Sequence, residues 1–242
     1  MIRALATVLT VLASPAASEC RQALALGLDV SASVDSHEYR LQTDGLAAAL
    51  QRPEVVRLIL SDIGAPVRLA IFEWSETNYQ RMLLGWTEIR TEQDIAQVTT
   101  LLNSVTRGTA PRGTAVGSAM QFGADLLSQQ KDCWKRTLDL SGDGKHNLGP
   151  HPRGVKQGLE NSGITINGLV IGADDPSHGD KRYVQVGELS AYYNTWVILG
   201  PGAFVEVALG FEAYEEAMTR KLVRELQGLT LSDASEALPF DQ

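Results

Sequence analysis

The stretch Ala23 to Ser33, ALALGLDVSAS, decides the fold class. Its first seven residues are a short apolar run without helical spacing, which predicts a β-strand buried on both faces. Such strands belong to parallel sheets that helices cover on both sides. The polar side chains that follow, Asp29, Ser31 and Ser33, therefore fall beyond the carboxyl end of the strand, where doubly wound sheets bind ligands.

Strands and amphipathic helices alternate along the rest of the chain. Further strands are predicted at 67–74, 80–86, 137–141, 164–171 and 195–199, and helices at 35–50, 53–60, 91–105, 115–127, 155–161 and 211–226. Only five residues separate the second strand from the third, which suits a hairpin and makes the third strand antiparallel. The pattern predicts an α/β fold with a doubly wound, Rossmann-like, mostly parallel six-stranded sheet. One edge strand is antiparallel, and helices cover both faces.

The first 18 residues, MIRALATVLTVLASPAAS, have the layout of a secretory signal peptide: one basic residue, an apolar run from Ala4 to Ala13, and then small residues. The alternative is a first core helix. We expect cleavage near Ser18, a single domain over residues 20–228, and a loose C-terminal tail over residues 229–242. No later apolar run is long enough to cross a bilayer, so a periplasmic or secreted protein without an integral membrane segment is expected.

The composition limits the classes of partner. The 242 residues carry 29 acidic against 21 basic side chains and a formal charge of −8. Phosphate contacts need a surface rich in Lys and Arg, so a general nucleic-acid binder is excluded. We expect a monomer.

Two further segments bring polar side chains to the same edge of the predicted sheet. Thr114 opens a helix, and Asp143 follows the fourth strand. Together with Asp29, Ser31 and Ser33 they offer two carboxylates and three hydroxyls, a hard-oxygen set that suits Mg²⁺ or Mn²⁺. The alternative is that these residues only cap helices and form turns.

This order of motifs resembles the von Willebrand factor type A (VWA) domain with its metal-ion-dependent adhesion site (MIDAS), and all five motif positions match. The pattern, with Pro201 to Phe204, is similar to an exported bacterial branch known only as a domain of unknown function. For the domain over residues 20–228, the resemblance implies one divalent cation (Mg²⁺, or Mn²⁺ or Ca²⁺), held directly by Ser31, Ser33 and Thr114. Asp29 and Asp143 would then act mainly through water, and an Asp or Glu of an unknown protein partner would fill an open coordination position.

Other residues are candidates for the rim of the site. Arg112 precedes Gly113 and would favour an anionic ligand, or it is a solvated loop residue. His146 and His151 fit no standard zinc spacing, so we interpret them as solvated or capping residues. Asp174 and Asp175 follow the fifth strand and would supply a second ion or, as we favour, a turn with Pro176.

Two other functional classes remain open. A metal-assisted phosphohydrolase would use Asp29 as its nucleophile, but Ser31 stands where a second acid is usual and Lys145 is a weak candidate for the required lysine. No G-x-S-x-G or H-E-x-x-H motif is present, so an enzyme is not the favoured class. A scaffold whose metal site has lost its role is the third class.

Each of the two cysteines lies at a similar distance in sequence before one of the candidate aspartates. Cys20 lies nine residues before Asp29, and Cys133 lies ten residues before Asp143. If both aspartates mark the carboxyl ends of neighbouring strands, both cysteines lie at the opposite ends, about 4.8 Å apart across the sheet. That spacing allows a disulfide, which an oxidising compartment permits, so we predict a bond between Cys20 and Cys133. The alternative is two buried thiols.

Overall fold

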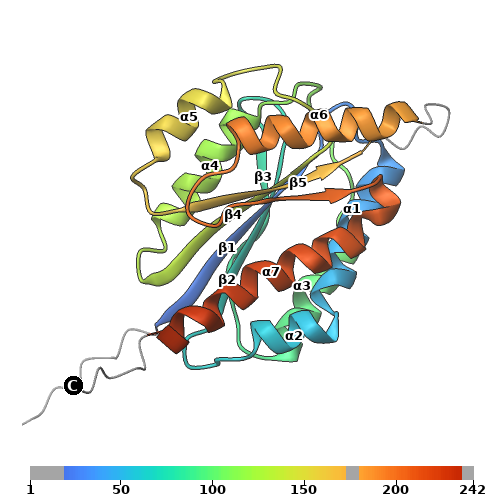
Figure 1. The fold of residues 1–242 in the computed structure, drawn as a ribbon. Helices are drawn as coiled ribbons and strands as arrows, with labels where there is room; N and C mark the ends of the chain where they lie inside the picture. Colours follow the sequence, from blue (N-terminus) through green and yellow to red (C-terminus); the bar gives the residue numbers. More distant parts are fainter. Residues whose placement is uncertain (1–18, 173–179, 236–242) are drawn as a thin grey trace, which may run out of the picture.

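The computed structural model describes residues 19–172 and 180–235 of the chain. Six strands form one sheet in the order β3-β2-β1-β4-β5-β6, and only β3 runs antiparallel to its neighbour (Figure 1). The strands are β1 (Cys20–Asp29), β2 (Val67–Trp74), β3 (Gln80–Ile89), β4 (Cys133–Gly142), β5 (Thr165–Ile171) and β6 (Val205–Ala208). The helices are α1 (Ser36–Leu50), α2 (Pro53–Ile59), α3 (Glu92–Ser104), α4 (Val116–Ser128), α5 (Pro152–Leu159), α6 (Asp180–Trp196) and α7 (Tyr214–Ser235), with a short 3-10 turn η2 (Phe211–Ala213) before α7.

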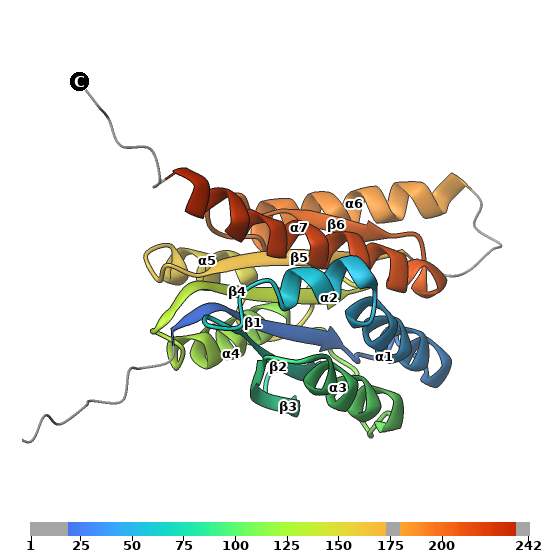
Figure 2. The ribbon, with the colours of Figure 1, turned by 90° about the horizontal axis from the view of Figure 1, so that it is seen from below.

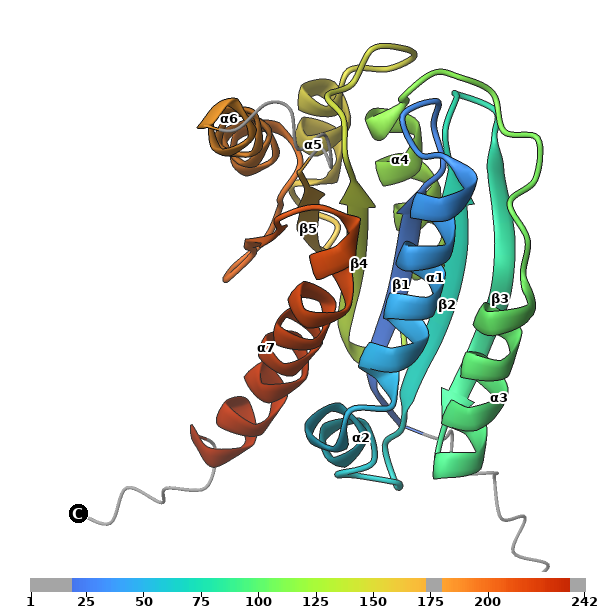
Figure 3. The same ribbon diagram turned by 90° about the vertical axis from the view of Figure 1, so that its right-hand side faces the viewer.

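Helices cover both faces of the sheet, as the sequence predicts. Every residue of β1 is buried. Because side chains alternate between the faces of a strand, Leu24, Leu26 and Leu28 pack with α1, α2, α3 and α7, whereas Ala23 and Ala25 pack with α4 and α6. Figures 2 and 3 show these two layers of helices with the sheet between them. The fold class is therefore the predicted one.

The last strand of the sheet was wrongly predicted at 195–199. Residues up to Trp196 belong to α6, and the last strand is β6, six residues beyond Leu199. Leu199 makes only an isolated antiparallel bridge with Ile166. The buried positions Val186, Leu189 and Tyr193 follow the spacing of one helix face, so this segment covers the sheet instead of joining it.

The predicted domain covers residues 20–228, between a signal peptide and a C-terminal tail. The predicted signal peptide, residues 1–18, lies outside the described residues. At the other end, α7 continues to Ser235, beyond residue 229 where the tail was predicted to begin. Within the ranges the structure describes, no helix is both long enough and apolar enough to cross a membrane.

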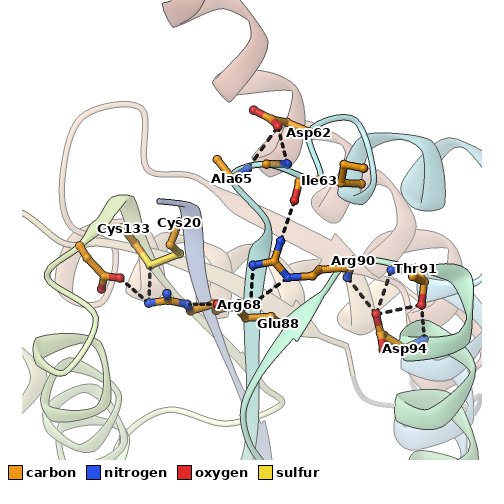
Figure 4. A network of polar contacts seen from close by, with 12 residues as sticks. Cys20, Asp62, Ile63, Ala65, Arg68, Glu88, Arg90, Thr91, Asp94 and Cys133 are labelled. Atoms are coloured by element: carbon orange, nitrogen blue, oxygen red, sulfur yellow. Dashed lines mark hydrogen bonds and ion pairs between the residues drawn. A yellow bond between two sulfur atoms is a disulfide. The ribbon is translucent and has the colours of Figure 1, made fainter. Parts of the chain in front are cut away.

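A disulfide joins Cys20 to Cys133 at the start of β1 and β4, as predicted. The two residues are register partners of the neighbouring strands, with Cα atoms 4.3 Å apart. A polar network continues from this bond across the sheet (Figure 4). Arg68 on β2 lies against Cys133 and donates to Glu88 on β3 at 3.1 Å, and Glu88 in turn accepts from Arg90 at 2.8 Å. The first strand is thus fixed at the end remote from Asp29.

A buried ionic cluster holds α7 against the opposite half of the sheet. Lys221 of α7 is fully buried and lies 2.9 Å from Asp139 of β4 and 2.8 Å from Glu225. Asn167 of β5 donates to Glu225 at 2.6 Å. Burial, reinforced by the charge of Glu225, raises the pKa of Asp139 to about 7, although Lys221 acts in the opposite direction. One cation therefore compensates two buried acids here.

Candidate metal site

The candidate site lies where β1 and β4 end side by side. Leu28 pairs with Ser141 in the sheet, so Asp29 and the segment Gly142-Asp143 leave it next to each other. Ser31 and Ser33 follow in the turn after β1, before the capping box of Asp35 and Glu38 begins α1. The pairing of β1 with β4 thus brings the first and the fourth strand loops together.

Hydrogen bonds connect four of the predicted ligands. Asp29 Oδ1 accepts from the backbone N–H of Ser31 at 2.8 Å. The Ser31 and Ser33 hydroxyl oxygens are 3.3 Å apart, and Ser33 Oγ donates to Asp143 Oδ1 at 2.7 Å. Asp29 and Ser31 are fully buried, whereas Ser33 is exposed and Asp143 is half-buried. The cluster therefore has a closed floor and an accessible side.

The fifth residue, Thr114, approaches from the segment before α4. A Cβ atom placed on Gly144 would lie 3.7 Å from Thr114 Oγ1, so the hydroxyl lies against the backbone that follows Asp143. Asn147 fixes this position, because its Oδ1 accepts from the Thr114 N–H at 2.9 Å and its own N–H donates to the Thr114 carbonyl at 3.0 Å. All five predicted ligands thus lie at one edge of the sheet.

The environment of Asp29 and Asp143 disfavours the negatively charged form of both carboxylates. Burial, and then the negative charge of Asp143, raises the pKa of Asp29 well above its usual range. Burial also raises the pKa of Asp143. Asp29 Oδ2 is buried and has no hydrogen-bond partner among the described residues. A buried anionic oxygen without a partner is costly, and a cation between the two carboxylates would compensate it.

Beneath the carboxylates the packing leaves no spare room. A Cβ atom on Gly142 would lie 2.4 Å from the Tyr193 hydroxyl oxygen and 3.2 Å from Asp29 Oδ2. Burial and the charges of Asp29 and Asp143 raise the pKa of Tyr193, so the phenol stays neutral. Glycine at 142 is thus required for the floor of the site to close.

The donor set points to a hard cation. Asp29 and Asp143 supply carboxylate oxygens, and Ser31, Ser33 and Thr114 supply neutral hydroxyls. Over residues 19–172 and 180–235 there is no group of three or more His, Cys, Asp or Glu side chains that could hold a metal. Mg²⁺ and Mn²⁺ prefer oxygen ligands of this kind, whereas structural zinc sites are built from Cys and His. The residues present therefore fit an oxygen-coordinated divalent ion.

The loop after β1 is held in place by residues that the sequence analysis did not identify. The Arg107 guanidinium donates to the carbonyl oxygens of Val30 and Ser31 at 3.1 and 3.3 Å, and Gln42 donates to that of Asp29 at 3.0 Å. Arg107 and Gln42, like Asn147, belong to no recognisable spacing motif. Only the folded chain shows that they act on the loop.

The predicted rim residues Arg112, His146 and His151 make different contacts in the structure. Arg112 is exposed, and its carbonyl oxygen accepts from the N–H of Ala32 at 3.3 Å. His151 caps α5, because its Nδ1 accepts from the Arg153 N–H at 3.1 Å, in agreement with the capping interpretation. The His146 ring lies edge-on to that of His151, and burial lowers the pKa of His146.

The predicted rim acids Asp174 and Asp175 lie outside the described residues. Lys145 forms an exposed ion pair with Glu188 at 3.0 Å. This pair borders a cavity of about 240 Å³ beside Asp143.

Solved structures with the same fold define the class of protein. The fold matches that of proximal thread matrix protein 1 from the mussel byssus, whose structure with a zinc occupied MIDAS motif has a TM-score of 0.59 and 14% identity over 86% of this chain and 46% of that one. It also matches a von Willebrand factor type A structure from Catenulispora acidiphila, with a TM-score of 0.56 and 14% identity over 86% and 43%. The pilus adhesin SpaC from Lactobacillus rhamnosus GG gives a TM-score of 0.54 and 12% identity over 87% and 30%. The domain therefore has a von Willebrand factor type A fold.

Sequence comparison gives the family. Residues 19–230 match the family model DUF1194, described as a protein of unknown function, and the chain belongs to this family. No curated protein matches the sequence significantly. The chain spans less than half the length of each of the solved structures above.

Proposed function

We propose that the protein is an exported, non-catalytic binding module that holds one divalent cation, Mg²⁺ or Mn²⁺ in the first instance, between its first and fourth strand loops. Ser31, Ser33 and Thr114 would bind the ion directly, and Asp29 and Asp143 would act mainly through water. The observation that carries the proposal is the buried Asp29 Oδ2, which has no hydrogen-bond partner in the described part of the chain and lies beside a second carboxylate whose pKa is also raised. The zinc occupied MIDAS motif in the mussel protein supports it.

The ion would serve to bind an acidic group of a protein partner. Hydroxyl ligands are neutral, so an ion held directly by Ser31, Ser33 and Thr114 keeps most of its charge for an external carboxylate. The chain itself is acidic, with a formal charge of −8, and would repel such a partner at long range without the ion. The adhesin SpaC among the structural matches supports a role in protein interaction.

Export is part of the same proposal. The Cys20–Cys133 bond suits an oxidising compartment, and the first 18 residues have the composition of a signal peptide. Both features support a periplasmic or secreted location.

The phosphohydrolase alternative finds less support. The Asp29 side chain is fully buried, and its Oδ1 accepts from the Ser31 N–H, so Asp29 is poorly placed to attack a phosphate. The Lys145 ammonium, the weak candidate for the lysine of such enzymes, pairs with Glu188.

A thermal unfolding experiment on residues 19–242 tests metal binding. With free Mg²⁺ or Mn²⁺ at about 100 times its dissociation constant, the folded state gains about 2.7 kcal/mol, or about 5–11 °C for a domain of this size. Asp29→Asn keeps the shape of the side chain and should remove this gain. Asp125→Asn makes the same charge change on the exposed surface of α4 and should keep it. An equal gain in Asp29→Asn, or none in the wild type with either ion, would refute the site.

A second experiment tests the partner. Capture from an envelope fraction, with and without EDTA, should recover a protein that is lost with EDTA and with Thr114→Ala. Metal binding without any EDTA-sensitive partner would favour a scaffold whose metal site has lost its role.

A further inference from the structure

An apolar groove lies between α2 and α3, at the end of the domain that carries the disulfide. It has a volume of about 850 Å³. Pro53, Val56 and Leu60 line it from the side of α2, and Ile95 and Ala96 line it from α3. α1 descends from the metal site to this end, so the groove and the candidate metal site lie at opposite ends of the sheet (Figure 3).

The two walls of the groove carry single charges of opposite sign. Arg57 lies on the α2 wall and Glu92 on the α3 wall, and both are exposed. Neither has an ion pair within the described parts of the chain. Nearby arginines differ in this respect, because Arg52 pairs with Glu215 and Arg90 pairs with Glu88. The groove is thus an apolar surface with a cation on one side and an anion on the other, and neither is ion-paired with any residue that the structure describes.

Beside the groove, two residues beyond its lining residue Ser61, an apolar side chain protrudes from a restrained loop. Ile63, on the loop after α2, is 64% exposed, which is the largest exposure among the bulky apolar residues described. Arg90 donates to its carbonyl oxygen at 2.7 Å, and Asp62 Oδ1 accepts from the backbone N–H groups of Gly64 and Ala65 at 2.9 and 3.2 Å. Figure 4 shows the Ile63 side chain pointing away from Arg90 and the rest of this network. The loop backbone that carries the protruding side chain is therefore preorganised.

We propose that this face binds a second copy of the chain in a two-fold symmetric dimer, with Ile63 of each copy inserted into the α2–α3 groove of the other. A two-fold interface must be self-complementary, because each contact occurs twice with the roles exchanged. This face carries both halves of each contact: a protruding apolar side chain next to an apolar groove, and a cation and an anion on opposite walls of that groove. Arg57 of each copy then lies against Glu92 of the other.

The proposed dimer differs from the monomer expected from the sequence, and its formation does not depend on the metal. Because the groove is at the end opposite the metal site, the two metal sites would point in opposite directions. One dimer could then hold two partner molecules at once, so its apparent affinity for a surface that displays many copies of the partner would exceed that of a single site.

Sedimentation velocity on residues 19–242 tests the dimer, at concentrations from about 1 to about 300 µM, which bracket micromolar dissociation constants. The wild type should reach twice the monomer mass with rising concentration. Ile63→Asp should weaken dimerisation at least tenfold. Met82→Asp, which places the same charge on an exposed apolar position of β3, should leave it unchanged. A monomer at every concentration, or a dimer that Ile63→Asp does not weaken, overturns the proposal.

Charge reversal gives a readout that misfolding cannot imitate. Arg57→Glu and Glu92→Arg should each weaken the dimer about tenfold, and the double variant should restore it, because the exchanged charges meet again across the two-fold axis. If the double variant is as weak as the single ones, the symmetric arrangement is wrong. If the chain becomes dimeric only after residues 236–242 are removed, the groove belongs to the chain's own C-terminal segment, which includes Leu238 and Phe240, and the proposal is likewise overturned.

Discussion

Breaking the disulfide should cost the protein a large part of its stability. The bond between Cys20 and Cys133 closes a loop with a sequence separation of 113 residues. In the chain-entropy model, a loop of that length stabilises the folded state by about 5 kcal/mol, because the crosslink restricts the unfolded chain. At about 2–4 °C per kcal/mol for a domain of this size, loss of the bond should lower the melting temperature by about 10–20 °C.

Urea unfolding of the oxidised and the reduced wild type measures this difference directly. The double variant Cys20→Ala with Cys133→Ala is the control, because a reductant should not change its unfolding midpoint. Asp29 lies nine positions beyond Cys20 along β1, about 30 Å of strand, so the gain in stability from Mg²⁺ should survive reduction. A difference below about 1 kcal/mol between the oxidised and reduced forms would refute the entropic argument.

Three further predictions concern the core. Lys221→Met should lower the free energy of unfolding by about 3–5 kcal/mol, because it leaves two buried acids without their cation. Arg220→Met removes an exposed cation one residue away and should cost about 0–1 kcal/mol in the same urea titration. Gly117→Ala should be strongly destabilising, since its new Cβ would lie 1.9 Å from a backbone carbonyl oxygen. Gly158→Ala, in a helix with nothing within 4 Å, should stabilise by about 0.5–1 kcal/mol, and equal effects of the two substitutions in thermal unfolding would contradict this geometry. Because the pKa of Asp139 is raised to about 7, its carboxyl favours the folded state at low pH, and this contribution is lost as the pH rises from about 4 to about 7. Asp139→Asn should remove that pH dependence, which urea unfolding of both proteins between those pH values would reveal.

The α/β class of the sheet, its antiparallel edge strand and the disulfide could be predicted because their determinants are local or fixed by the geometry of strands. A capping box at Asp35 and a hairpin between β2 and β3 each need only a few residues of sequence. The cysteine pair followed from counting back along two neighbouring strands, and it succeeded because β1 and β4 are in the register Cys20 to Cys133. Strand rise and spacing fix such distances without any knowledge of side-chain packing.

The sequence-based predictions were wrong or incomplete where tertiary packing determines the structure. The apolar residues around Leu199 resemble a strand, but Val186, Leu189 and Tyr193 before them form the buried face of α6. β6 is only four residues long and follows a turn with Gly200 and Gly202 at positive φ, so it gives a weak signal in the sequence. Around the candidate metal site, the sequence predicts the residues that could bind an ion but not those that support them. Arg107 reaches the Val30 carbonyl across 77 positions of sequence, and no spacing rule reveals such a contact.

The disulfide at the start of β1 also determines how the domain would behave under mechanical load. If the chain is pulled by its two ends, tension that enters at Cys20 passes through the sulfur bridge directly to Cys133. The chain between the two cysteines then carries no tension, and about 380 Å of extended polypeptide, at about 3.4 Å per residue, cannot be drawn out while the bridge is intact. That protected segment contains Asp29, Ser31, Ser33 and Thr114, so a pull that unravels α7 would leave the first loop of the candidate site enclosed within the covalent ring.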